Sequence, residues 1–303
     1  MTSTEGTPFH KGERSVQDRA GTRGRMDVAG PRLIRDHMPD QHRELFERLP
    51  YLIAGAVDAS GQPWATLLTG DPGFVATAAQ EMRIATLPDL LDPVRQALQP
   101  GAAIGLLGIE LSTRRRNRMN GRVRTVDSSG LAVDVVQSFG NCPKYIHVRQ
   151  HHRLSRPRPV TRLAESASLS TKARALIETS DTFFIATTSG KQTEGWTQGT
   201  DVSHRGGDPG FVLVQATDDG TRLLVPDYAG NGFFNTLGNL ALAPHAGILF
   251  VDFAHGHLLQ LAARSEVVWH DSETAAATGA ARMLVLEIVG GQWLENALNL
   301  RWE

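Results

Sequence analysis

The chain has 303 residues, 41% of them hydrophobic and 21% charged, which is the composition of a globular protein longer than one core usually supports, so we expect two domains. Its net charge of −1 excludes a strong overall attraction to nucleic acid or to anionic membranes. A single cysteine, Cys142, excludes an internal disulfide and every multi-cysteine metal site. No apolar run approaches the ~20 residues of a membrane span and none opens the sequence, so we expect a cytoplasmic protein.

Residues 1–39 are polar and rich in glycine and arginine. We expect them to form an N-terminal arm, either as a disordered tail or lying across a partner subunit. Residues 17–26 hold too many glycines to predict a helix there. From residue 40 to 49 the spacing of apolar side chains predicts an amphipathic helix, with Asp40 as its N-cap and Pro50 ending it.

Residues 40–149 form a strand-rich first domain in this interpretation. Apolar runs at 51–57 and 102–109 predict buried strands, and helical spacing is found at 90–98. Residues 150–168 combine proline and charge without an apolar pattern, which predicts a linker. Residues 169–303 form the second domain, opening with a helix at 170–179 that has Ser170 as its N-cap.

The second domain repeats the first. The sequence Asp-Pro-Gly-Phe-Val occurs at 71–75 and again at 208–212. Further matches pair 105–107 with 247–249, 52–54 with 184–186, and Pro63-Trp64 with Gly195-Trp196, in the same order and at nearly constant separation. This indicates duplication of a unit of about six strands rather than a solenoid array, and strands this short usually close into barrels. The predicted fold class is therefore mainly β, with two tandem β-barrels and short flanking helices.

One stretch of the second copy suits an anionic ligand. Ser203, His204 and Arg205 end a strand before a turn rich in Gly, Asp and Pro, and a Gly- and Asn-rich segment precedes a short helix near 235–242. Small residues let backbone N–H groups approach an anion, and a helix start adds further donors, as a phosphate-bearing cofactor requires. A hairpin with ordinary turn residues explains the same pattern equally well.

The chain resembles the FMN-binding split barrels of pyridoxamine 5′-phosphate oxidase-like proteins, and in particular a two-domain subgroup. The motifs that carry the resemblance are Pro8-Phe-His-Lys-Gly-Glu13, Phe139-Gly-Asn-Cys-Pro-Lys-Tyr-Ile146, Ser203-His-Arg-Gly-Gly207 and Asn235-Thr-Leu-Gly-Asn-Leu240. The resemblance covers both halves and implies two tandem FMN-binding split barrels. It places the flavin on the second copy, because the first has Leu67-Leu-Thr-Gly70 in place of the basic strand end.

The resemblance also implies which residues bind FMN. They are predicted to be Ser203, His204, Arg205, Asp227, Asn231, Asn235, Thr236, Arg116 and Ser138. Better-known members of the family place an Arg-Lys pair against the phosphate where this chain has Asn235 and Thr236. Two neutral donors thus replace two cations, and Ser203, His204, Arg205 and Asn231 are the candidates to compensate.

The densest basic cluster comprises arginines 114, 115, 116, 118, 122 and 124. A charge run usually marks a solvated or nucleic-acid-binding face. Alternatively, some of these guanidinium groups turn toward an anionic ligand between the two copies. The lack of a wider basic excess or of interleaved aromatic residues argues against nucleic acid. We predict no metal site, because the histidines at 147, 151, 152, 255 and 257 have no carboxylate at ligand spacing, and we expect Cys142 to be buried and inert.

The first functional hypothesis is an FMN-dependent oxidoreductase that exchanges a hydride or electrons with a small molecule, with NAD(P)H as the expected donor. No catalytic side chain is predicted, because the flavin supplies the chemistry. The alternative is a split-barrel module that binds flavin or haem without turnover. Oxidation of pyridoxamine phosphate has less support, because the residues for its substrate phosphate are not found. We expect a homodimer, although the duplication itself supplies a pseudo-dimer interface.

Overall fold

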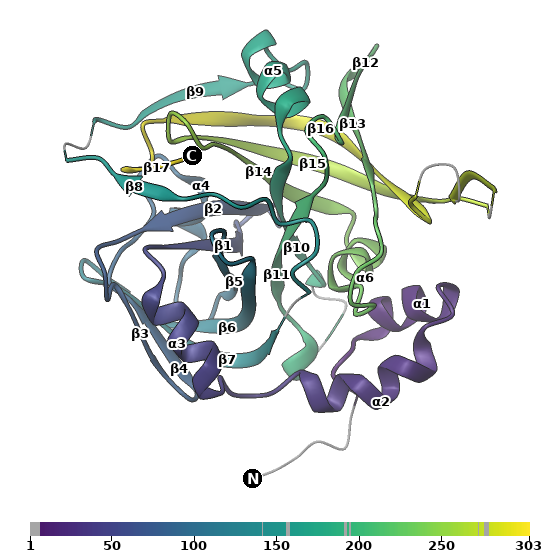
Figure 1. The fold of residues 1–303 in the computed structure, drawn as a ribbon, viewed down its shortest axis with the longest axis horizontal. Helices are drawn as coiled ribbons and strands as arrows, with labels where there is room; N and C mark the ends of the chain where they lie inside the picture. The colour runs from purple at the N-terminus through teal and green to yellow at the C-terminus, as the bar shows by residue number, and fades with distance from the viewer. Residues whose placement is uncertain are drawn as a thin grey trace.

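Two antiparallel sheets dominate the structure (Figure 1). The computed structural model describes residues 7–140, 142–155, 158–190, 193, 195–271, 273–275 and 279–303. The strands of the first sheet are β1 (Tyr51–Val57), β2 (Pro63–Thr69), β3 (Val75–Ala78), β4 (Glu81–Ile84), β5 (Ala103–Glu110), β6 (Arg115–Asp127) and β7 (Gly130–Gly140). Those of the second are β10 (Thr182–Thr188), β11 (Thr200–Gly206), β12 (Leu213–Thr217), β13 (Gly220–Pro226), β14 (His245–Asp252), β15 (His257–Trp269) and β16 (Arg282–Glu295).

The two sheets have the same topology. The first runs β2-β1-β5-β6-β7-β4-β3 and the second β11-β10-β14-β15-β16-β13-β12, so every strand in these two orders has a counterpart, and a further strand pairs with β16 outside this order. The repeated five residues form the same turn: the N–H of Phe74 donates to Asp71 O and that of Phe211 to Asp208 O, each at 2.9 Å. The mainly β fold with two copies of one split barrel is thereby confirmed.

The register corrects two of the sequence matches. Gly55 lies opposite Gly105 and Ala186 opposite Gly247, so Gly55 corresponds to Ala186 and the predicted match of 52–54 with 184–186 is one residue out. A slip of one residue reverses which face of a strand each side chain occupies. The second match is also wrong, because Trp64 lies within β2 whereas Trp196 lies in a 3₁₀ turn (Gly195–Thr197) before β11.

The helices flank the sheets. They are α1 (Lys11–Arg19), α2 (Arg23–Leu33), α3 (Asp40–Arg48), α4 (Pro93–Ala97), α5 (Thr171–Thr179) and α6 (Asn235–Leu242). Ser170 caps α5 as predicted, accepting from the N–H of Ala173. The cap of α3 is Pro39 rather than Asp40, and α4 is shorter than its predicted span. No helix among the described residues is long and apolar enough to cross a membrane.

The N-terminal arm differs from expectation, because the described part of it forms α1 and α2 and packs on the second copy beside α6 (Figure 1). Tertiary contact outweighs the low helix propensity here: Phe9 and Met26 are buried in an apolar cluster with Phe233. Gly21, at φ 65°, lies between the two helices.

The predicted linker also contains strands. β8 (His151–Arg153) pairs with β17 (Leu300–Trp302), and β9 (Thr161–Glu165) pairs with β16. Both partner strands lie more than a hundred residues further along the chain, so no local pattern reveals the pairing. Arg156 and Pro157 of this segment lie outside the described residues.

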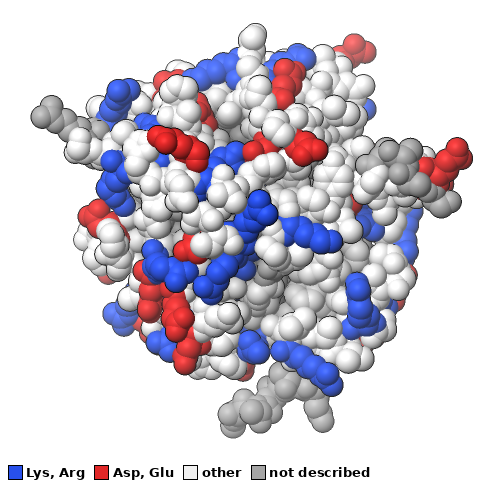
Figure 2. Space-filling model, in the orientation of Figure 1, with Lys and Arg blue, Asp and Glu red and all other residues white. Residues whose placement is uncertain are grey.

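The two copies meet face to face in an apolar core of their own, which includes Ile53 and Leu107 of the first copy and Phe184 and Leu249 of the second. Backbone approaches closely on both sides. A Cβ atom on Gly105 would lie 2.8 Å from Val202 N, and one on Gly247 would lie 2.7 Å from Trp64 Cα. This packing brings β5 and β6 of the first copy against β11 of the second. On the face that Figure 2 shows, basic and acidic side chains are interspersed.

Candidate functional site

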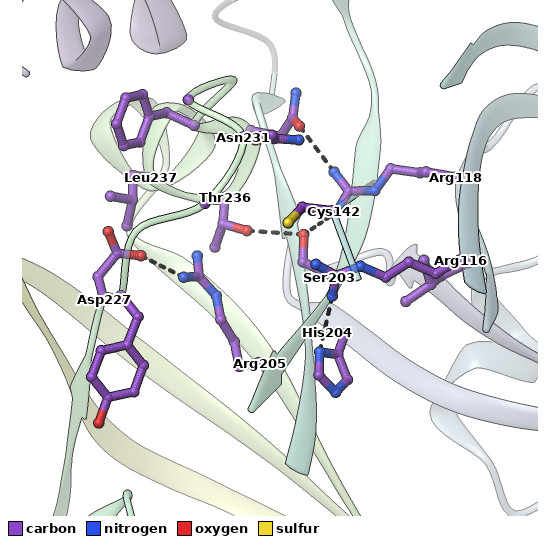
Figure 3. A pocket seen from close by; sticks show the side chains of 16 residues that line it. Arg116, Arg118, Cys142, Ser203, His204, Arg205, Asp227, Asn231, Thr236 and Leu237 are labelled. Carbon is purple, nitrogen blue, oxygen red and sulfur yellow. Dashed lines mark hydrogen bonds and ion pairs between the residues drawn. The ribbon is translucent and has the colours of Figure 1, made fainter. Parts of the chain in front are cut away.

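A cavity of about 120 Å³ lies where β6 of the first copy meets β11 and the start of α6 in the second (Figure 3). It is lined by Leu107, Arg116, Arg118, Cys142, Ser203, His204, Arg205, Asp227, Tyr228, Gly230, Asn231, Gly232, Phe234, Asn235, Thr236 and Leu237. Eight of the nine residues predicted to bind the cofactor are among them, the exception being Ser138. The structure therefore brings these eight together, while their role in binding stays a prediction.

Neighbouring side chains of β11 point to opposite faces of the strand. Ser203 and Arg205 share one face: Ser203 Oγ accepts from Thr236 Oγ1 at 3.0 Å and also from Arg118 of β6, and Arg205 forms an ion pair with Asp227. His204 points the other way, toward β6 of the first copy. Residues from both copies are thus required to build the cavity.

Arg118 forms the buried ionic link between the copies. Its Nη1 donates to Asp201 Oδ1 and to Asn235 Oδ1, each at 3.1 Å, and its Nη2 donates to Ser203 Oγ. Burial lowers the pKa of Arg118, while Asp201 opposes that shift. Asp201 also accepts from Asn120 Nδ2 at 2.7 Å, so its carboxylate is well satisfied, although Arg118 Nε is buried without a partner. The pair fixes β6 against β11.

Arg116 differs, because no carboxylate of the described residues lies within ion-pair distance of it. Its Nη1 donates to His204 Nδ1 at 2.9 Å, and its Nε is buried without a partner. Burial lowers the pKa of Arg116 to about 10, which leaves the guanidinium charged at neutral pH. A largely buried cation without a counter-charge is unfavourable unless a ligand supplies one.

His204 is neutral at physiological pH. Burial, and then the charge of Arg116, hold its pKa well below its usual value. Since Nδ1 accepts from Arg116, the ring hydrogen is on Nε2, which is buried without a partner. The Nε atom of Arg205 is in the same situation. Buried donors are nearly always paired, so this set of unpaired N–H groups favours an acceptor ligand such as a phosphate.

The start of α6 adds further donors. Its N-cap, Phe234, has left-handed backbone angles (φ 61°, ψ 30°), and no side chain caps the helix. Asn235, Thr236 and Leu237 of its first turn line the cavity. The positive end of the helix dipole therefore adjoins the same space as Arg116 and Arg205.

Ser138 lies apart from this cavity. Its hydroxyl is fully buried and contacts His42 Nδ1 at 2.8 Å, on the side of β7 that faces α3. Burial lowers the pKa of His42 to about 4, so this is a neutral structural contact. Ser138 directly precedes the motif at 139–146, but the strand turns this side chain away from the second copy.

Sequence reasoning missed Arg118, Tyr228, Phe234 and Leu237 as lining residues. The signal for Arg118 was present, because residues two apart on a strand share a face and Arg116 was proposed. Cys142, expected to be buried, is half-buried and lines the cavity; its neighbour Asn141 lies outside the described residues.

Some arginines of the cluster face the cavity and others lie on the surface, so each of the two interpretations holds for part of it. Arg116 and Arg118 turn toward the cavity, whereas Arg124 is on the surface and pairs with Glu81 and Asp134. Among the described residues, no three His, Cys, Asp or Glu side chains gather as metal ligands would.

Comparison with protein-family models and with curated proteins gives no match. Among solved structures, a pyridoxamine 5′-phosphate oxidase candidate from Lactobacillus delbrueckii is 12% identical, with 43% of this chain and 98% of that chain covered and a TM-score of 0.32. The heme storage protein HutZ from Vibrio cholerae is 16% identical, with 42% and 95% covered and a TM-score of 0.27. An F420 reductase is 13% identical, with 35% and 97% covered and a TM-score of 0.24. Similarity at this level does not establish the function of this chain. Its fold is defined by its own strand order.

Proposed function

We propose that the cavity binds the phosphate of FMN and that the chain is an FMN-dependent oxidoreductase of the pyridoxamine 5′-phosphate oxidase-like type. The observation that carries the proposal is Arg116, a cation without a carboxylate partner among the described residues, in a cavity whose other unpaired groups are also donors. A phosphate supplies both the negative charge and the acceptor oxygens that these groups lack.

The residues present fit both parts of a flavin mononucleotide. Arg116, Arg205, Ser203 and Thr236 suit the phosphate, together with the uncapped amides of α6. Ser203 Oγ accepts two hydrogen bonds, which leaves its own hydrogen free to donate. The aromatic and aliphatic lining residues, Leu107, Tyr228, Phe234 and Leu237, suit a planar ring system.

When bound, the flavin supplies hydride or electron transfer. The chain's own groups hold and orient it, and they exclude water from the buried side of the cavity. We assign no side chain as an acid or base. NAD(P)H as donor and a small-molecule acceptor or substrate belong to the same proposal.

The proposal is tested by titrating the purified protein with FMN and with riboflavin, which lacks the phosphate, and following flavin fluorescence. We expect FMN to bind at least about tenfold more tightly than riboflavin, as one charge-assisted contact provides. Arg116→Ala should weaken FMN by about 10- to 100-fold and leave riboflavin nearly unaffected. Arg124→Ala, on the surface of the same strand, is the matched control. Absence of FMN binding, or equal binding of both flavins, rejects the phosphate site.

Turnover needs a separate experiment. Anaerobic addition of NADPH or NADH to the FMN-loaded protein should bleach the flavin absorbance. Flavin that stays bound and oxidised would instead favour a binding module without turnover.

Haem is the second candidate ligand, favoured by the neutral His204 beside the cavity, since imidazole is a common haem ligand. Ligation through Nε2 requires the ring hydrogen on Nδ1, where it would oppose the donor of Arg116. The geometry therefore favours FMN. A Soret shift with haem that disappears in His204→Ala would reverse this preference.

A further inference from the structure

The N-terminal helix α1 is packed closely enough on α6 to act on the cavity. The two helices cross at glycines: a Cβ atom on Gly238 would lie 2.6 Å from Glu13 Cα, and one on Gly12 would lie 2.8 Å from Leu242 Cγ. Because neither position has room for a side chain, Glu13 lies directly against the first turns of α6. The motifs at 8–13 and 235–240 are thus joined in space.

Glu13 is 4% exposed and has contacts in two directions. Its Oε2 accepts from the N–H of His10 at 2.8 Å, which completes the capping box of α1. Its Oε1 accepts from Asn235 Nδ2, and Asn235 Oδ1 in turn accepts from Arg118 Nη1 at 3.1 Å. Glu13 thereby fixes which end of the Asn235 amide faces Arg118, although Glu13 itself does not line the cavity.

The charged and titratable groups that face Glu13 are few. Arg118 on β6 already pairs with Asp201 on β11, and His10 is kept neutral because burial lowers its pKa. Asn235 and Asn239 on α6 are uncharged. Burial, reinforced by Asp201, raises the pKa of Glu13 to about 8, while the hydrogen bonds from His10 and Asn235 and the charge of Arg118 oppose that shift. If Glu13 ionised, two carboxylates, those of Glu13 and Asp201, would lie near the single cation Arg118.

We propose that Glu13 is a positioning residue of the anion site: in its uncharged form it holds Asn235 and Arg118 for an anionic ligand, and its ionisation opposes that ligand, so that binding is coupled to proton uptake. This inference rests on the proposed function, and FMN is the probe. The coupling follows from charge, because an excess negative charge one amide away from the cavity repels a phosphate.

The test measures FMN affinity between pH 6.5 and 9 for the wild type, Glu13→Gln and Asp18→Asn. FMN is largely a dianion throughout this range, since its second phosphate pKa is about 6. The wild-type Kd should rise roughly tenfold between pH 7 and 9, as the competent fraction falls. Glu13→Gln should bind as the wild type does at pH 7 and show a flat profile. Asp18→Asn, an exposed change on the same helix, should follow the wild type.

A wild-type profile that is flat, or one that Glu13→Gln retains, overturns the proposal. Absence of FMN binding at every pH would instead reject the proposed function. In that case the thermal unfolding of the ligand-free protein, measured as Tm at several pH values, tests the role of Glu13. A carboxyl with a raised folded pKa contributes stability that is present below its unfolded pKa, 4.5, and is lost as pH rises through about 8. If the difference in Tm between the wild type and Glu13→Gln does not change from pH 5 to 9, Glu13 does not titrate in this way and the inference fails.

Discussion

The two copies contact each other at two equivalent places, called the two junctions below. The backbone arrangement is the same at both, but the side chains differ. At one junction β6 faces β11; at the other, its counterpart β15 faces β2. Arg118 lies opposite Leu107 and Gln260 opposite Leu249, so Gln260 stands in the second junction where Arg118 stands in the first. By the same register Leu258 replaces Arg116.

The ends of β2 and β11 also differ, with apolar side chains in the first copy and basic ones in the second. Because Thr69 pairs with Tyr51 and Gly206 with Thr182, the segment Thr66-Leu67-Leu68 corresponds to Ser203-His204-Arg205. The first copy therefore has two leucines where the second has a histidine and an arginine, and Leu67 is part of the apolar core between the copies.

Hydrogen bonds to the backbone and to Asp92 close the second junction. Gln260 is fully buried, and its Nε2 donates to Ala65 O at 2.9 Å and to Asp92 Oδ1 at 3.1 Å. Asp92 also caps α4, accepting from the N–H of Val94 at 2.9 Å, and bonds Thr66. The comparison teaches that duplication supplied two equivalent frameworks, and that a few cationic side chains distinguish the anion-binding candidate from its packed counterpart.

The largest expected effect comes from giving the first junction the residue of the second. Arg118→Gln leaves Asp201 buried without its cation, so the free energy of unfolding should fall by about 3–5 kcal/mol. Chemical denaturation measures this loss. Arg124→Gln, which removes surface pairs on the same strand, should cost far less, because solvent screens exposed pairs. Similar losses in the two variants would mean that the buried link is no stronger than a surface pair.

A smaller effect, similar at both junctions, is expected from substituting the glycines there. Gly105→Ala and Gly247→Ala each push a methyl group into the backbone of the other copy, which should lower the unfolding free energy by about 1–3 kcal/mol. Gly199→Ala, which points into open space, is the control. The comparison of the two junctions as equivalent frameworks fails if one of the pair proves neutral.

The smallest expected effect appears only in the pH dependence of stability. Burial raises the pKa of Asp92 from 3.8 to about 6. Its contribution is therefore fully present below pH 3.8 and is lost as pH rises through about 6. The Tm of the wild type relative to Asp92→Asn should decline between about pH 4 and 6 and stay constant above that range. A difference in Tm that does not change between about pH 4 and 6 would mean that Asp92 does not titrate in this way.

Much of the fold was predictable because its signals are local. The repeated turn at 71–75 and 208–212 revealed the duplication, and Ser170 and the span of α6 were correctly assigned from capping residues and turn composition. The errors fell where long-range contacts decide. Neither the helices of the N-terminal arm nor the pairing of β8 and β9 has a local signal, because their partners are α6, β17 and β16.

For the candidate site, the second copy's residues were identified from the basic strand end and the helix start. Ser138 was predicted to bind the cofactor together with Arg116, but its side chain faces His42 rather than the cavity, and the direction of a side chain depends on register. Glu13 had been noticed only as part of a motif. Its contact with Asn235 spans more than two hundred positions of the chain.

The amino-acid sequence by itself determined the strand-rich duplicated architecture and the placement of the candidate ligand residues at the end of β11 and the start of α6, since hydrophobic alternation and turn residues act over a few positions. Arg116 was predicted for that site, but only the tertiary structure decided that Arg118 lies beside it and that α1 lies behind it. Packing between distant segments fixes which charges are buried together: it places Arg116 beside His204 rather than a carboxylate, and it buries Glu13, which raises the pKa of that carboxyl.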